Sequence, residues 1–312
     1  MKNHFCLIAN FRASLTRRRG LAKLTLLGAL LSSLVPASGG TISKVTANSA
    51  SQKMKTLVGV VSSTGDSEWT MDAVVIVEHG KLISPYADEK EDQRTLFARE
   101  YFSAGRKYRL TFGGGDAGTA TIRKWDTGCN NIHATVEAKT TAKLTDKVMA
   151  LATNSETLGT KQGARRALTA AEHQSVMQMV KQIYTAKGTP AAMLRRMTTT
   201  NLTATDLDGD GKFELVGSFV IATGRKFRRD LFLIAEPQGV SYKAALVDYQ
   251  AYKLQPEGFD SAINFVDQLD LDGDGIGEVF AVQGGFDAYG YAIYKKGNGR
   301  WRKVYEATGD AC

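Results

Sequence analysis

The chain contains two acidic stretches with one pattern, Asp206-Leu207-Asp208-Gly209-Asp210-Gly211-Lys212-Phe213-Glu214 and Asp270-Leu271-Asp272-Gly273-Asp274-Gly275-Ile276-Gly277-Glu278. Each stretch places carboxylates at loop positions 1, 3, 5 and 9, and its glycines let the backbone turn back tightly. Four acidic side chains within nine residues repel one another unless a cation lies among them. Because Ca²⁺ binds about six to eight oxygen ligands at roughly 2.3–2.6 Å, the repeat predicts two calcium-binding loops.

The type of loop follows from the positions beyond the shared acids. An EF-hand loop needs an acid at position 12. That position holds Gly217 in the first stretch and Ala281 in the second, and neither side chain can chelate. The residues downstream are β-branched and aromatic, which favours strands over helices. The pattern therefore indicates loops that join strand to strand.

Acids at positions 1, 3, 5 and 9 between strands resemble the calcium loops of FG-GAP/VCBS repeats. Such loops connect strands in the β-propellers of integrin α-subunits. The resemblance covers roughly residues 200–310 and implies two calcium sites. Since a propeller usually has about four to eight blades, two loops imply two β units or part of a propeller. The implied ligands are the side chains of Asp206, Asp208, Asp210 and Glu214 with the carbonyl of Lys212, and those of Asp270, Asp272, Asp274 and Glu278 with the carbonyl of Ile276.

The rest of the chain predicts a mainly β protein with a short helical segment. Residues 55–140 form a predicted β-rich domain, a sandwich or a barrel-like sheet, because Lys107–Phe112 and Ile132–Lys139 alternate apolar and polar residues. Residues 200–312 form the predicted calcium-binding β domain, in which each loop precedes a buried strand and two further strands.

Residues 141–199 are predicted to hold a linker and a helical segment. The linker, 141–168, is expected to include a helical turn. Thr169 and Glu172 form a capping box, and an apolar stripe follows it (Val176, Met179, Val180 and Ile183). Gly188-Thr189-Pro190 ends this helix, and a second short helix is predicted at Ala191–Met197.

Residues 1–37 have the composition of an export signal. They carry six basic and no acidic residues, and the apolar run Leu24–Val35 is too short to span a bilayer. Val35-Pro36-Ala37 offers a cleavage site, and Arg18-Arg19 resembles a twin-arginine signal. We therefore expect Sec or twin-arginine export to a bacterial periplasm or the extracellular space, with residues 38–54 as a flexible leader.

The net charge of +8 comes mostly from that signal. The remaining chain has 34 basic against 32 acidic side chains, which argues against a nucleic-acid partner. Cys129 and Cys312 would remain after cleavage. In an oxidising compartment they either form a disulfide or stay as two separate thiols.

No catalytic residue is predicted. His79, His133 and His173 lack the spacing of metal ligands, and the chain has no Gly-x-Ser-x-Gly elbow. A C-terminal aromatic cluster indicates either cross-strand packing or a glycan- or peptide-stacking face (Phe286, Tyr289, Tyr291, Tyr294, Trp301 and Tyr305). We expect an exported, non-enzymatic calcium-binding module with a protein or glycan partner. The alternative is an exported hydrolase with structural calcium and catalytic groups between its domains.

Overall fold

The computed structural model describes residues 54–63, 68–85, 91–128, 131–145, 147–223, 227–253, 262–284 and 288–311. They belong to one compact unit, Lys53–Cys312. The predicted signal peptide, the predicted leader apart from Met54, and both Cys129 and Cys312 lie outside the described residues. None of the helices within these ranges has the length and apolar character needed to cross a membrane.

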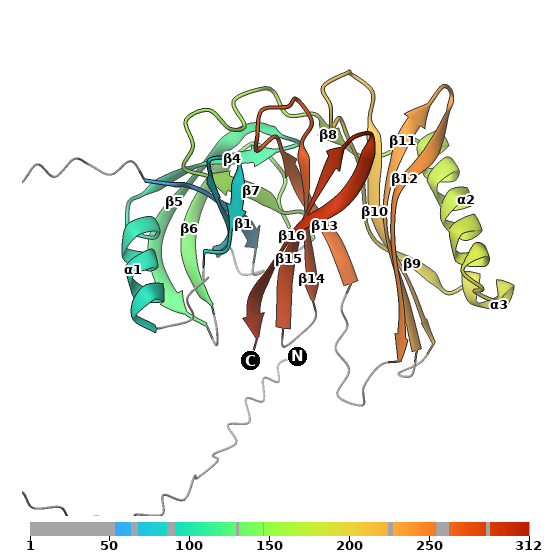
Figure 1. The fold of residues 1–312 in the computed structure, drawn as a ribbon, viewed down its shortest axis with the longest axis horizontal. Helices are drawn as coiled ribbons and strands as arrows, with labels where there is room; N and C mark the ends of the chain where they lie inside the picture. The colour runs from blue at the N-terminus through green and yellow to red at the C-terminus, as the bar shows by residue number, and fades with distance from the viewer. Residues whose placement is uncertain are drawn as a thin grey trace, which may run out of the picture. The chain divides into compact units, whose positions relative to one another are not determined.

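The described chain is mainly β, as predicted, and its first part closes into an antiparallel barrel (Figure 1). Neighbouring strands pair around the ring, and the pairing of the first with the last completes it. A short strand, β3 (Lys81–Ile83), extends the sheet beyond β2. In order around the ring, the barrel strands are β1 (Thr56–Ser63), β7 (Ala150–Thr153), β4 (Lys107–Phe112), β5 (Gly115–Thr127), β6 (Ile132–Thr140) and β2 (Trp69–Glu78).

Two features of the barrel differ from the sequence prediction. Helix α1 (Glu91–Tyr101) was not predicted, because five of its eleven residues are charged, yet Phe97 and Tyr101 stack at 4.7 Å within the barrel core. The described residues of the predicted linker, 141–145 and 147–168, form no helix; they supply the barrel strand β7 and the two-residue strand β8 (Arg165–Arg166). A four-residue strand such as β7 is too short for its period to be recognised.

Each acidic loop lies between the first two long strands of an antiparallel sheet. The first-loop sheet consists of β8, β9 (Met197–Thr205), β10 (Glu214–Thr223), β11 (Phe227–Gln238) and β12 (Ser241–Lys253). The second-loop sheet consists of β13 (Ala262–Leu269), β14 (Glu278–Gly284), β15 (Ala288–Gly297) and β16 (Arg300–Ala311). The strands downstream of the loops agree with the prediction. In addition, β9 and β13 lead into the loops.

Three apolar clusters stack the barrel, both sheets and the helices in that order (Figure 1). Successive side chains of β14 point to opposite faces of the second-loop sheet and so enter two different clusters. Phe280 faces the barrel, while Val279 and Ala281 face the first-loop sheet. The second-loop sheet is therefore covered on both faces. The outer face of the first-loop sheet is covered by α2 (Ala170–Ala186) and α3 (Ala191–Leu194).

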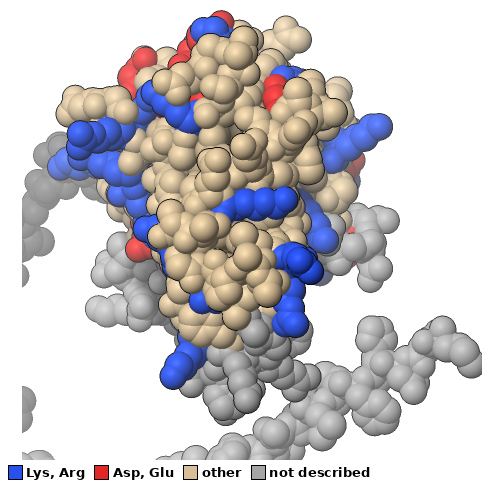
Figure 2. Space-filling model, turned by 90° about the vertical axis from the view of Figure 1, so that its right-hand side faces the viewer, with Lys and Arg blue, Asp and Glu red and all other residues tan. Residues whose placement is uncertain are grey.

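The helices largely follow their sequence signals. The capping box is confirmed, since Thr169 and Glu172 hydrogen-bond each other reciprocally at the start of α2. α3 is shorter than predicted because β9 already begins at Met197. Figure 2 shows the helix-covered side, where Lys and Arg are scattered among uncharged residues and few acidic ones appear.

A buried carboxylate on β13 helps to join the second-loop sheet to the barrel and, through an ion pair, to the first-loop sheet. The Asp267 carboxylate, fully buried on β13, accepts hydrogen bonds from the Gly113 N–H at 2.9 Å and from the Arg165 guanidinium at 3.3 Å. Burial raises the pKa of Asp267 to about 6, although Arg165 and the Gly113 N–H oppose the shift. This contact attaches the β4–β5 turn to β13.

Candidate metal centre

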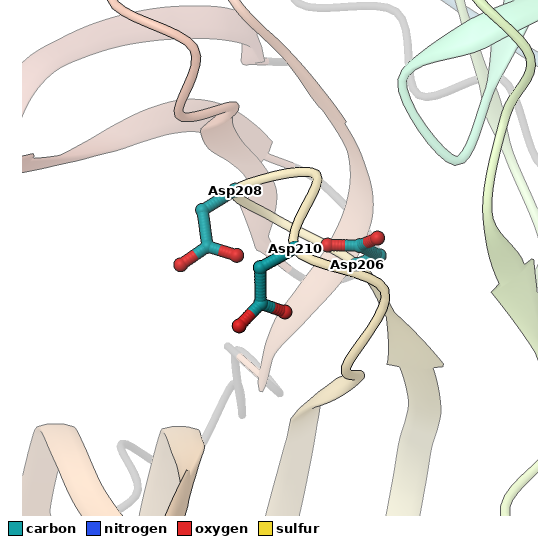
Figure 3. Close-up of side chains that lie close together, drawn as sticks. All are labelled: Asp206, Asp208 and Asp210. Carbon is teal, nitrogen blue, oxygen red and sulfur yellow. The ribbon is translucent and has the colours of Figure 1, made fainter.

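The first loop, Asp206–Glu214, gathers three carboxylates where it joins the end of β9 to the start of β10 (Figure 3). Asp206, Asp208 and Asp210 each offer an oxygen, and these oxygens lie within 4.8 Å of one another. Two oxygens on opposite sides of a calcium ion are about 5 Å apart, twice the usual Ca–O distance. Asp208 and Asp210 are exposed and Asp206 is half-buried, so an ion can reach them. These three groups fit Ca²⁺ in spacing and in chemistry.

The backbone of the first loop is wrapped around its leading carboxylate. Asp206 accepts hydrogen bonds from the Gly209 N–H at 2.8 Å and from the Gly211 N–H at 3.0 Å. Both glycines have φ above +70°, a conformation that L side chains rarely adopt. The spacing of Asp and Gly within the stretch thus produces a tight loop through hydrogen bonds of the chain itself.

The second loop, Asp270–Glu278, repeats this geometry closely. Asp270 accepts from the Gly273 N–H at 2.7 Å and from the Gly275 N–H at 3.0 Å. Oxygens of Asp270, Asp272 and Glu278 lie within 4.8 Å of one another.

The position-9 glutamates are buried beneath their loops. Glu214 accepts from the Leu207 N–H at 2.9 Å, and Glu278 accepts from the Leu271 N–H at 2.7 Å. Burial raises the pKa of Glu214 to about 7, and it also raises the pKa of Glu278. Each glutamate therefore has one oxygen engaged with its own loop.

A lysine distinguishes the two loops. Lys295 on β15 reaches the second loop, and its Nζ lies 2.6 Å from Asp272, 3.0 Å from Asp274 and 2.8 Å from Glu278. Burial lowers the pKa of Lys295, but its hydrogen bonds to the three carboxylates outweigh burial and raise that pKa overall. Nothing in the loop motif points to Lys295, because this residue lies 17 positions beyond Glu278.

The corresponding place beside the first loop holds an acid. β14 pairs with β15 with Val279 opposite Tyr294, and β10 pairs with β11 with Leu215 opposite Ala235. Continuing each register by one residue places Lys295 beside Glu278 and Glu236 beside Glu214. Glu236 is itself paired with Lys296 at 2.8 Å and with the Trp301 N–H at 3.1 Å.

The first loop has a lysine of its own, but in a different setting. Lys212 contacts Asp210 at 2.8 Å, and its side chain is 68% exposed. This hydrogen bond, together with one from the Lys212 N–H, lowers the pKa of Asp210.

The predicted ligands thus fall into two groups. The close carboxylate groups contain six of the eight predicted side chains, while Glu214 and Asp274 lie outside them. The N–H groups of Lys212 and Ile276 donate to Asp210 and Asp274, respectively. Ligation by their carbonyl oxygens stays a prediction.

The two loops also contact each other. The Gly277 N–H of the second loop donates to the Leu207 carbonyl of the first at 2.7 Å. The Gln268 side chain on β13 donates to the Asp206 carbonyl at 2.9 Å. The start of the first loop is therefore hydrogen-bonded to the sheet that carries the second loop.

A polar cleft of about 700 Å³ lies where the barrel meets both sheets. Its lining includes Asp72, which accepts hydrogen bonds from the hydroxyls of Tyr289 at 2.8 Å and Tyr291 at 2.7 Å. His133 lines the same cleft and is the cross-strand partner of Asp72 in the β2–β6 register. Hydroxyl side chains also line the cleft (Ser62, Ser63, Thr70, Thr199 and Thr200), together with Lys147, Asn264 and the apolar Met149 and Val282.

The other members of the predicted aromatic cluster have separate roles. Tyr294 and Trp301 are buried between the two sheets, and the Tyr305 hydroxyl donates to the Val74 carbonyl at 2.9 Å. Phe286 lies outside the described residues. His79 lies in the β2–β3 turn and His173 in the first turn of α2, apart from the cleft pair.

Comparisons of the chain with protein-family models, with curated proteins and with solved structures find no match.

Proposed function

We propose that the chain is an exported, calcium-binding, non-enzymatic module, and that the first loop holds the ion. The observation that carries the proposal is the group of carboxylate oxygens from Asp206, Asp208 and Asp210 within 4.8 Å of one another. The resemblance of both loops to FG-GAP/VCBS repeats supports calcium over other cations. The carboxylates would supply oxygen ligands, and calcium would neutralise their mutual repulsion.

Calcium in this position would be mainly structural. The first loop joins β9 to β10 and is hydrogen-bonded to the second loop through Gly277. Extracellular calcium modules bind with dissociation constants of about 10⁻⁴–10⁻³ M. At free calcium a hundredfold above that constant, one site stabilises the folded state by about 2.7 kcal/mol.

The cleft is the place we propose for a partner molecule. Its volume of about 700 Å³ lies within the usual range for small-ligand sites, roughly 300–1,000 Å³. The hydroxyl-rich lining and the fixed rings of Tyr289 and Tyr291 suit a glycan end or another polar group. A partner protein would therefore present such a group rather than a flat surface.

The experiment is a thermal melt of the chain without its signal peptide, in calcium, in magnesium and in EGTA. We expect EGTA to lower the Tm by roughly 1–6 °C relative to millimolar calcium, which is about one to ten times the expected dissociation constant. The variant Asp206→Asn with Asp208→Asn should melt at the same temperature in all three. An unchanged Tm of the wild type in EGTA would remove the basis for a calcium-binding function.

The second candidate is an exported hydrolase with structural calcium, and the cleft pair Asp72 and His133 favours it. A hydrolase of this kind would use the pair as acid and base. Screening the chain and His133→Ala against glycoside and peptide substrates separates the candidates. Turnover that disappears in His133→Ala would replace the binding module with an enzyme.

A further inference from the structure

We infer that Lys295 is a built-in cation of the second loop, so that the chain binds one calcium ion rather than two. This inference rests on the proposed function of the first loop. It goes further because it assigns a calcium ion to the first loop and a lysine ammonium to the second, although the two loops look alike in sequence.

The geometry around Lys295 matches that of a bound cation. Its Nζ contacts carboxylates at loop positions 3, 5 and 9 (Asp272, Asp274 and Glu278) at distances of 2.6–3.0 Å. An ammonium group has three N–H donors, so these three acceptors use all of them. The same three carboxylates are the side chains that a calcium ion would need, together with Asp270.

Lys295 and a calcium ion would compete for the carboxylates of the second loop, and the lysine has the advantage. Its ammonium is delivered by β15, the strand next to β14, and its side chain is 26% exposed. An attached group acts at a high effective concentration, about millimolar or more, and a free ion must displace it. Calcium would also have to leave the ammonium without its carboxylate partners in a half-buried place, which is unfavourable.

Among the described residues, no lysine holds the equivalent cross-strand place beside the first loop. Glu236 occupies that place and pairs with Lys296 at 2.8 Å, so the nearest lysine there is engaged by another carboxylate. Lys212, the cation within the loop, contacts Asp210 and is 68% exposed, so it can turn into solvent when an ion enters. The first loop therefore keeps its carboxylates for a metal.

A consequence is that the second loop is held together without calcium. Lys295 joins the loop to β15 within the second-loop sheet, and Gly277 joins the same loop to Leu207. The second loop thus provides a permanent support against which the first loop binds its ion.

Calcium stoichiometry tests the inference directly. Isothermal titration of calcium into the chain should show one ion per chain, and Lys295→Met should show two. Methionine keeps a similar stem and removes the charge. Lys303→Met is the matched control, because Lys303 lies on the neighbouring strand β16 with a side chain 27% exposed, and pairs with Glu306. It should still bind one ion.

A second titration does not depend on the folding of a Lys295 variant. Asp206→Asn with Asp208→Asn disables the first loop and leaves the second intact, so this variant should bind no calcium. One ion bound by it, or two by the wild type, would overturn the role of Lys295 and leave the calcium-binding function standing. A wild type that binds none would overturn the proposed function itself, and a Lys295→Met chain that folds but still binds one would overturn the inference.

Discussion

The two acidic loops share their backbone and differ in their neighbours. Asp206 and Asp270 accept the same pair of glycine N–H groups, and Glu214 and Glu278 accept the same leucine N–H. Across the neighbouring strand, one loop faces an acid and the other faces a lysine. The acidic motif therefore determines the shape of a loop, while the adjacent strand determines which charges surround its carboxylates.

The largest expected difference between the loops appears in their pH dependence without metal. Burial raises the pKa of Glu214 from 4.5 to about 7. As pH rises, the Glu214 carboxyl therefore loses its proton at a lower pH in the unfolded chain than in the folded chain. This group stabilises the fold below about pH 4.5, and that stabilisation is lost by about pH 7. The loss is up to about 3 kcal/mol.

Urea unfolding in EGTA between pH 4.5 and 8 measures this loss. Glu214→Gln should flatten the profile more than Glu278→Gln, because Lys295 already stabilises the ionised form of Glu278. Glu156→Gln, at an exposed carboxyl, is the control and should leave the profile unchanged. Equal flattening by both loop variants would show that Lys295 does not separate the loops.

Paired ligand substitutions should produce the next largest difference. Asp206→Asn with Asp208→Asn should abolish the stabilisation by calcium, about 2.7 kcal/mol at a hundredfold excess over the dissociation constant. Asp270→Asn with Asp272→Asn should retain it, although it lowers the stability in both calcium and EGTA. Denaturant midpoints with and without calcium give both quantities, and the reverse pattern would assign the ion to the second loop.

Removing the ammonium of Lys295 should have a smaller effect on stability. In EGTA, Lys295→Met should destabilise the fold by about 1–3 kcal/mol, since it leaves three carboxylates facing one another. Calcium should restore most of that loss, whereas magnesium should restore less because it prefers a tighter octahedron. A variant as stable as the wild type in EGTA would mean that the lysine contacts contribute nothing.

The smallest effect is expected for Lys212→Ala in the first loop. Its contact with Asp210 is exposed and screened by solvent, so stability in EGTA should hardly change. Calcium affinity should rise slightly, because a competing cation is removed. A tenfold loss of affinity in titration would instead indicate that the lysine helps to hold the ion.

The sequence predicts the local geometry of this fold better than its long-range contacts. The alternation of apolar and polar residues in Lys107–Phe112 identifies a strand, because the polarity of each side chain indicates whether it faces the core or solvent. The Asp-Gly spacing likewise predicts both loops, since their hydrogen bonds connect residues that are close in the chain. Helix α1 was missed although Phe97, Ala98 and Tyr101 recur at helical spacing and are buried, because this short stripe lies among charged residues.

The position of Lys295 could not be predicted for a different reason. It depends on the register between β14 and β15, and a shift of one residue would turn the side chain to the other face. The pairing of Asp72 with two C-terminal tyrosines likewise spans more than 200 residues and requires the assembled layers. The charge of each loop and the composition of the cleft are tertiary properties.

The hydrogen bond between the Gly277 N–H and the Leu207 carbonyl has a consequence for the rate of unfolding. Separation of the two sheets must break this bond and disturb the start of the first loop. An ion held there would act on the native state, so it would slow unfolding more than it speeds folding. If the chain is exported and binds calcium as proposed, the surrounding calcium concentration would then set how long each molecule survives among proteases.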